Sequence, residues 1–248
     1  MLAENLDSLP VGVYSFAGIQ FAHAFQPIFD VLEKTVVSQE VLVRGADGDG
    51  AAQLFQQITQ EQLHAFDQHS RECSLLTAHR LGLDCCINLN ISPGSLLIDD
   101  GLLLEDTLQT ARENGFSANQ LILEITESEA VDQPQQLATI INRMRQSGMR
   151  FAIDDFGAGY AGLNMLVEIQ PEYLKLDRHL VDHIDQHGPR QAIARAVVEL
   201  CDDLGIELIA EGVERPQEYA FLAQLGIRLF QGYLFARPGF IELPEVTF

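Results

Sequence analysis

Two adjacent acids, Asp154 and Asp155, end an apolar run and precede a turn that begins at Gly157. At a separation of ~4 Å and an effective dielectric of ~20, two carboxylates repel each other by about 4 kcal/mol, so the pair needs a cation, a proton or strong hydrogen-bond donors. The pair is therefore a candidate site. The alternative is an ordinary strand end, where alternation turns one acid to solvent and the other caps the next helix.

Polar side chains also end the other short apolar runs in this part of the chain. Each run is followed by a longer segment of helical periodicity, a pattern typical of parallel strands joined by crossover helices. The runs are 85–91, 121–125, 151–155, 173–177, 206–211 and 227–231, and the polar residues are Asn90, Glu124, Asp154 with Asp155, Lys175, Glu211 and Gln231. Because the carboxyl ends of barrel strands meet on one face, we expect these side chains to form one site.

The number of runs and the chain length favour an α/β barrel. Further strands are expected at 11–16, 23–29 and 36–44, and one or two helices at 51–81. About eight barrel strands in 248 residues favour a (β/α)8 fold over an open doubly wound sheet. No GxGxxG or GxxxxGK follows the first strands, which weakens the nucleotide-binding sheet as an alternative. With no linker rich in Pro, Gly or Ser, residues 1–248 are expected to form a single domain.

Carboxylates, an amide and one lysine around a single mouth suit hard divalent cations. Mg²⁺ and Mn²⁺ prefer oxygen ligands, and adjacent acids can bridge two ions ~3.5–4 Å apart, an arrangement used in phosphate-ester cleavage. Lys175 could orient or help deprotonate the attacking water, or offset charge on the phosphate. The formal charge of -21, with only 15 Lys and Arg, argues against nucleic acid as a partner. A phosphate ligand would therefore need metal ions to mediate its binding.

Nothing in the sequence predicts export or a membrane partner. The four cysteines show no metal-ligand spacing and are expected to be reduced thiols of a cytoplasmic protein. There is no basic segment followed by an apolar core at the start, and no run of about 18 apolar residues. His179, His183 and His187 recur at helical spacing, but beside Asp182 and Asp185 they are expected to be solvated rather than metal ligands.

Glu40 lies in the middle of the run 36–44. On a parallel strand this position would place Glu40 away from the catalytic face, whereas an antiparallel strand would allow it to join the other acids.

Across nearly its whole length, the sequence resembles the EAL-domain phosphodiesterases that hydrolyse the bacterial second messenger cyclic di-GMP, including EAL domains attached to light-sensing modules. The motifs, which span residues 25–238, are FQPIFD (25–30), EVLVR (40–44), NLNIS (88–92), LEITE (123–127), DDFGAGYAGL (154–163), LKLD (174–177), AEGVE (210–214) and QGYLFARP (231–238). The resemblance implies a modified TIM barrel with one early antiparallel strand.

The resemblance also implies a role for each motif residue. One metal ion would be held by Glu40, Asn90, Glu124 and Asp154, and a second by Asp154, Asp155 and Glu211. Lys175 and Gln231 would position the attacking water, so that the catalytic set is Glu40, Lys175, Glu211 and Gln231. Substrate contacts would come from Gln26, Leu42, Arg44 and Asp177, and Glu127 would brace the loop after Asp155. The ions would be Mg²⁺ or Mn²⁺, Ca²⁺ would inhibit, and the product would be linear pGpG.

Two departures from the family pattern leave a second interpretation open. The signature triplet is Glu40-Val41-Leu42, with Val in place of Ala, and Ala158 and Ala161 stand where Thr and Ser are common. No ligand is lost, which favours an active enzyme. The alternative is a weak or inactive EAL domain that binds cyclic di-GMP or a regulatory or effector protein; a barrel acting on another phosphodiester is a third. The family also implies a homodimer with contacts near 157–166.

Overall fold

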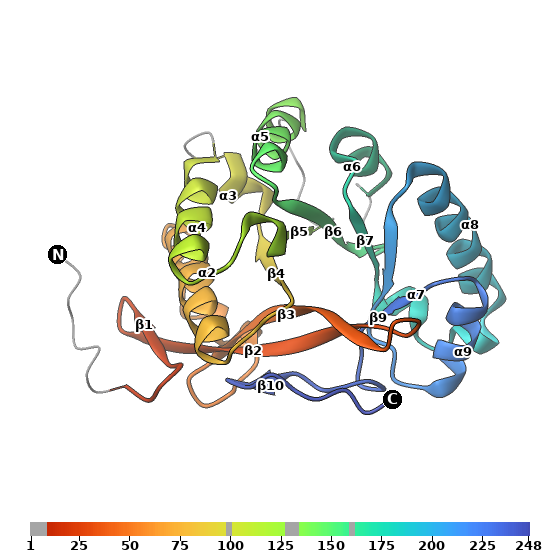
Figure 1. Ribbon diagram of the computed structural model, residues 1–248, viewed down its shortest axis with the longest axis horizontal. Coiled ribbons are helices and arrows are strands. Elements are labelled where there is room, and N and C mark those ends of the chain that lie inside the picture. Colours follow the sequence, from red (N-terminus) through yellow and green to blue (C-terminus); the bar gives the residue numbers. More distant parts are fainter. Residues whose placement is uncertain (1–8, 98–100, 127–133, 159–161) are drawn as a thin grey trace.

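In the computed structural model, which describes residues 9–97, 101–126, 134–158 and 162–248, the strands form a closed barrel with helices on its outer face (Figure 1). The predicted α/β barrel is confirmed. The strands are β1 (Tyr14–Phe16), β2 (Ile19–Asp30), β3 (Thr35–Gly45), β4 (Cys86–Ile91), β5 (Leu121–Thr126), β6 (Arg150–Phe156), β7 (Tyr173–Leu176), β8 (Glu207–Ala210), β9 (Leu229–Phe230) and β10 (Gly239–Phe240).

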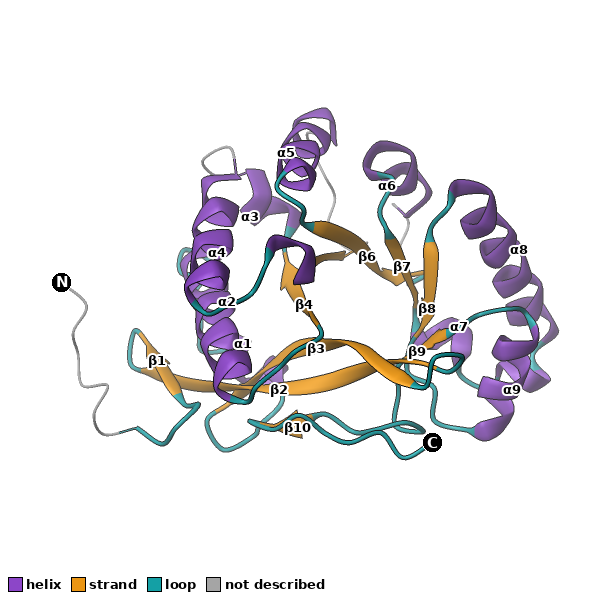
Figure 2. Ribbon diagram, viewed as in Figure 1, coloured by secondary structure: helices purple, strands orange, loops and turns teal. Residues whose placement is uncertain are grey.

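The helices alternate with the strands from β3 onward. They are α1 (Ala51–Phe55), α2 (Leu63–Arg80), α3 (Pro93–Leu97), α4 (Leu102–Glu113), α5 (Pro134–Gln146), α6 (Gly162–Ile169), α7 (Arg178–Val181), α8 (Gly188–Leu204) and α9 (Pro216–Gln224), with 3-10 turns η3 (Ala118–Gln120) and η4 (Ile184–Gln186). Figure 2 shows that the helices cover β4 to β8, whereas β10 and the C-terminal segment lie along β2. Among the described helices, none combines the length and apolar character needed to cross a membrane.

One barrel strand is reversed, and it is β2. Strands β3 to β9 run parallel to their neighbours, while β2 pairs antiparallel with β3 on one side and β9 on the other, which closes the barrel. The strand that carries Glu40 is therefore not the reversed one, because β3 is parallel to β4 and Glu40 pairs with Asn88. Glu40 points to the same face as its partner Asn88, and it lies at the mouth although it is in the middle of its strand, because β3 continues past the mouth to Gly45.

Alternation along each strand separates an apolar barrel floor from a polar mouth. Ile28, Ile209 and Leu229 form a buried cluster inside the barrel, against which Tyr173 packs. Outward residues of the same strands, such as Leu174, join the large core beneath the helices. Because side chains repeat with a period of two, the inward position after each floor residue lies nearer the mouth. These upper inward positions are occupied by Lys175 after Tyr173, Glu211 after Ile209 and Gln231 after Leu229.

Candidate metal centre

Lys175 is at the centre of the polar mouth and is almost completely buried. Its Nζ lies 3.1 Å from Glu40 Oε2, 2.9 Å from Glu124 Oε2, 3.1 Å from Asp154 Oδ1 and 2.6 Å from Glu211 Oε1. Burial acts to lower the pKa of Lys175, but the four carboxylates outweigh it and hold the pKa well above the usual value. The ammonium group is therefore a permanent charge that draws together acids of β3, β5 and β6 and the residue that follows β8.

Two overlapping groups of acids have the geometry to hold metal ions. Ligand oxygens of Glu40, Glu124 and Asp154 lie within 4.8 Å of one another, and so do those of Asp154, Asp155 and Glu211. Asp154 belongs to both groups, as a residue that bridges two ions must. These are the carboxylates that the resemblance to EAL domains assigns to the two ions.

Asp155 reaches the site because the backbone departs from regular strand geometry. In a regular strand, Asp154 and Asp155 would point to opposite faces. The pairing of β6 with β7 shifts register between Ile153 and Phe156, and Asp155 adopts a left-handed φ of 56°. Such a bulge re-aims a side chain, and here it brings both carboxylates into one group. The interpretation of Asp154 and Asp155 as an ordinary strand end with one acid directed away is therefore wrong.

The amides predicted at the mouth contact the acids. Gln231 Nε2 donates to Glu40 Oε2 at 2.7 Å, and Asn90 Nδ2 lies at the longer distance of 3.5 Å from Glu40 Oε1. Asn88, which was not among the predicted residues, is fully buried and donates from Nδ2 to Glu124 Oε1 at 2.7 Å. Its position two residues before Asn90 on β4 was the available signal, since both face the barrel interior.

The cluster carries more negative charge than one lysine can balance. Burial, followed by the charge on Glu40, raises the pKa of Glu124 to about 8. Burial and then Asp154 raise the pKa of Asp155 to about 6, and burial also raises the pKa of Glu211. Without another cation, the acids relieve their repulsion by retaining protons. A set of buried oxygen donors with this excess charge suits Mg²⁺ or Mn²⁺, so the residues present fit the implied ions.

Two cavities flank Leu42 at the mouth. One, of about 260 Å³, lies over the acids and is bordered by Gln26, Leu42 and Asp177 among others. The other, of about 460 Å³, is bordered by Leu42 and Arg44 together with residues of α2. The structure thus brings all four residues assigned to substrate to the cavities. Asp177 also caps α7, since its Oδ1 accepts from His179 N at 2.9 Å.

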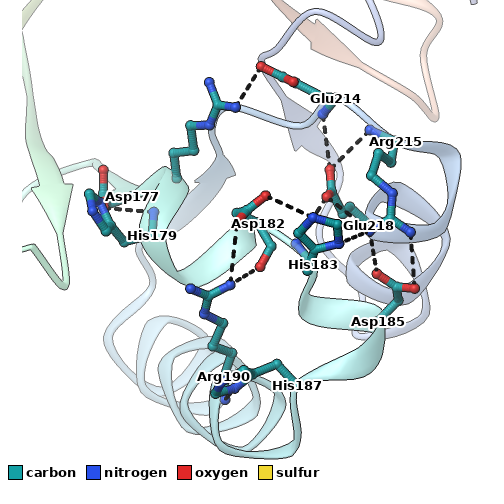
Figure 3. A network of polar contacts seen from close by, with 11 residues as sticks. Asp177, His179, Asp182, His183, Asp185, His187, Arg190, Glu214, Arg215 and Glu218 are labelled. Carbon is teal, nitrogen blue, oxygen red and sulfur yellow. Dashed lines mark hydrogen bonds and ion pairs between the residues drawn. The ribbon is translucent and has the colours of Figure 1, made fainter.

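Five residues singled out in the sequence lie away from the mouth or outside the described part of the chain. Glu127, assigned to bracing the loop, and Ala161 lie outside the described residues. The three histidines do not share a helix. His179 contacts Asp177, His183 contacts Arg215, and His187 accepts from Arg190 N, so they do not converge on one point (Figure 3).

The sequence of the whole barrel matches the model of one protein family. The EAL domain model matches residues 14–238. The chain belongs to the EAL-domain family. Of the curated relatives, the blue light- and temperature-regulated antirepressor BluF of Escherichia coli is 32% identical over 225 residues, which are 90% of this chain and 56% of BluF. The cyclic di-GMP phosphodiesterase NbdA of Pseudomonas aeruginosa is 33% identical over 159 residues, which are 64% of this chain and 19% of NbdA.

A solved EAL structure has the same fold and contains a metal and a nucleotide. BlrP1 of Klebsiella pneumoniae, in its manganese and cyclic di-GMP complex, is 34% identical with a TM-score of 0.87; the match covers 96% of this chain and 64% of that chain. This EAL-domain chain therefore spans about half of BluF, a fifth of NbdA and two thirds of BlrP1. Its fold is shared with a protein that binds cyclic di-GMP.

Proposed function

We propose that this EAL-domain chain hydrolyses cyclic di-GMP to linear pGpG with two Mg²⁺ or Mn²⁺ ions. The observation that carries the proposal is the pair of acid groups sharing Asp154 at the mouth of the barrel. When bound, the two ions supply an activated water and stabilise the leaving oxygen of the phosphodiester. All six residues assigned as ligands are retained: Glu40, Asn90, Glu124, Asp154, Asp155 and Glu211.

The residues around the ions bind the substrate and hold the water. Leu42 separates two cavities, and each would take one half of a symmetric dinucleotide. Arg44 borders the larger cavity and offers its guanidinium to a phosphate. Lys175 and Gln231 both contact Glu40 Oε2, and they would orient the attacking water beside that carboxylate. The permanent charge on Lys175 suits it to orient the water rather than to accept its proton.

A cyclic di-GMP receptor or protein-interaction module is the second candidate. It is favoured by BluF, which is named an antirepressor and matches 90% of this chain. The substitution of Val41 into the signature triplet adds volume beside Glu40. The enzyme is preferred because every proposed ligand and both amides remain at the mouth.

We also propose that the chain forms a homodimer through α6. Leu163 and Val167 are one helical turn apart, and their exposed fractions are 65% and 72%. Two large apolar side chains so exposed on one helix face suit a contact with a second copy.

Product analysis tests the enzymatic proposal. Purified protein is incubated with cyclic di-GMP and Mn²⁺, and the products are separated by chromatography. We expect pGpG to accumulate as the substrate disappears, and Glu40→Ala to lower turnover by on the order of 10³-fold. Intact cyclic di-GMP despite measurable binding would favour the receptor. Cleavage of linear dinucleotides but not of cyclic di-GMP would indicate another phosphodiesterase.

A further inference from the structure

A buried carboxylate outside the metal centre ties together two segments that reach it. Glu218 lies in the first turn of α9 and has an exposed fraction of 1%. Its Oε2 accepts from Glu214 N at 3.1 Å and from Arg215 N at 3.0 Å, while its Oε1 accepts from His183 N at 3.0 Å. Figure 3 shows the carboxylate between these backbone groups. One side chain therefore joins the loop after β8 to the segment after β7.

A charged group of the centre lies on or directly after the strand that precedes each of these segments. The β8 loop begins with Glu211, and β7 carries Lys175, whose Nζ lies 2.6 Å from Glu211 Oε1. Glu211 N donates to Leu176 O at 3.2 Å, which fixes the start of the loop against β7. Glu218 fixes its far end, so the residues between are held from both sides.

The loop between these two fixed points approaches two other segments. Val213 N donates to Gln231 O at 3.1 Å, and Val213 O accepts from Leu234 N at 3.0 Å, so the segment after β9 also holds the middle of the loop. Gly212 has a left-handed φ of 62°, and an added Cβ would lie 2.7 Å from Arg178 Cγ. The loop therefore passes close to the β7 segment at a position that only glycine fits. The direct ion pair between Arg178 and Glu214, at 2.8 Å, is substantially exposed and contributes little in water.

An outer layer of contacts shields the Glu218 carboxylate from water. The Arg215 guanidinium donates to both carboxylate oxygens of Asp185, at 3.1 and 3.3 Å, and also contacts His183 Nδ1 at 2.6 Å. These side chains lie beside Glu218 and are joined to one another by polar contacts (Figure 3). Loss of the Glu218 acceptors would leave three shielded backbone donors without partners, so the loop would have to move to satisfy them.

We infer that Glu218 is a positioning residue that holds the Glu211 carboxylate in the second metal group, formed by Asp154, Asp155 and Glu211. The inference rests on the metal centre of the proposed function. Glu218 belongs to neither acid group and borders neither of the two cavities at the mouth. It sets the loop that carries one ligand, and it has no contact with the first group of Glu40, Glu124 and Asp154.

Mn²⁺ titration calorimetry on the full chain tests this assignment in the absence of substrate. Glu218→Gln keeps the shape and one acceptor oxygen, and Glu218→Asp keeps the charge but withdraws the oxygens. We expect each to weaken the second Mn²⁺ site roughly tenfold, the lower end of the effect of outer-shell partners, and to leave the first site unchanged. The melting temperature of each variant is measured alongside.

Glu172→Gln is the matched control, because Glu172 also joins two elements, accepting from Arg145 Nε and from Phe151 N, both at 2.8 Å. Glu172 lies at the end of the strands opposite the metal centre. The substitution Glu172→Gln should therefore lower the melting temperature through the lost contacts but leave both Mn²⁺ affinities unchanged. Unchanged affinity in the Glu218 variants, or equal losses at both sites or in the control, would overturn the inference. Wild-type protein that binds Mn²⁺ without cleaving cyclic di-GMP would contradict the enzymatic proposal alone.

Discussion

At the residue scale, the centre combines one buried cation with acids that retain protons. Lys175 lies within 3.1 Å of four carboxylates, yet the pKa values of Glu124 and Glu211 are raised. The raised values reflect the burial of several like charges in a small volume. Divalent ions would replace protons in this balance, which links metal binding to pH.

Mn²⁺ affinity should therefore rise with pH between about 6 and 8. The pKa of Asp155 is about 6 and that of Glu124 about 8, so both must lose bound protons before they coordinate a cation. Over this range each proton displaced increases the apparent affinity by up to about tenfold per pH unit. Calorimetry in buffers of different ionisation enthalpy measures the protons released. An affinity independent of pH, with no proton release, would contradict the assigned ligands.

Removal of the central cation gives a second prediction. Lys175→Met leaves the surrounding carboxylates without their buried partner, at a cost of about 3–5 kcal/mol in the free energy of unfolding. Mn²⁺ should restore part of this loss, because it supplies positive charge to the same acids, while turnover stays abolished. Chemical unfolding with and without Mn²⁺ measures both effects. A variant as stable as the wild type in the absence of metal would show that Lys175 does not hold the acids together.

At the element scale, the junction of β2 and α2 contains a buried neutral histidine. His23 is fully buried, its Nε2 lies 3.0 Å from Ser70 Oγ, and burial lowers its pKa to about 3. The ordinary pKa of about 6.5 applies once the chain unfolds. Between these values the unfolded chain binds a proton that the folded chain does not.

The free energy of unfolding should therefore fall as pH decreases from 6.5 towards 3, by about 1.4 kcal/mol per pH unit from this residue. His23→Gln removes the titrating group and should flatten the slope by that amount, whatever its own effect on stability. His179→Gln is the control, since His179 is largely exposed. Urea unfolding at a series of pH values gives the slope of the free energy of unfolding against pH. Equal slopes for wild type and His23→Gln would show that His23 does not cause the pH dependence.

The order of strands and the polar residues at their ends were predictable from the sequence. Continuous apolar runs and helical spacing are local patterns, and the strands β4 to β9 coincide with the predicted runs to within a few residues. The direction of β2 could not be predicted from local patterns, because it depends on pairing with β9, which is distant in the sequence. The two-residue strand β10 is too short to produce a pattern.

The candidate site was predictable in composition but not in geometry. Period-two alternation would separate Asp154 from Asp155, and the bulge that joins them depends on a left-handed residue held by tertiary contacts. Glu218 was also missed. Its sequence position is that of an ordinary helix cap, and its contact with His183, 35 residues away, exists only in the folded chain.

At the scale of the whole molecule, the mouth of the barrel and α6 provide separate surfaces. Val167→Asp should weaken the proposed dimer by at least about tenfold, because it places a charge in an apolar contact. Its circular dichroism should stay unchanged, since Val167 is exposed. Sedimentation velocity measures the association, with Ile193→Asp as control on another helix that has an exposed apolar side chain. A dimer unaffected by Val167→Asp would place the contact elsewhere.

The central claim is that the acids at the barrel mouth hold two ions bridged by Asp154. Anomalous scattering at the manganese edge, measured on crystals grown with Mn²⁺ and cyclic di-GMP, tests it most directly. The account predicts two peaks about 3.5–4 Å apart, one among Glu40, Glu124 and Asp154 and the other among Asp154, Asp155 and Glu211. Nucleotide at the mouth with no manganese peak between these carboxylates would contradict it.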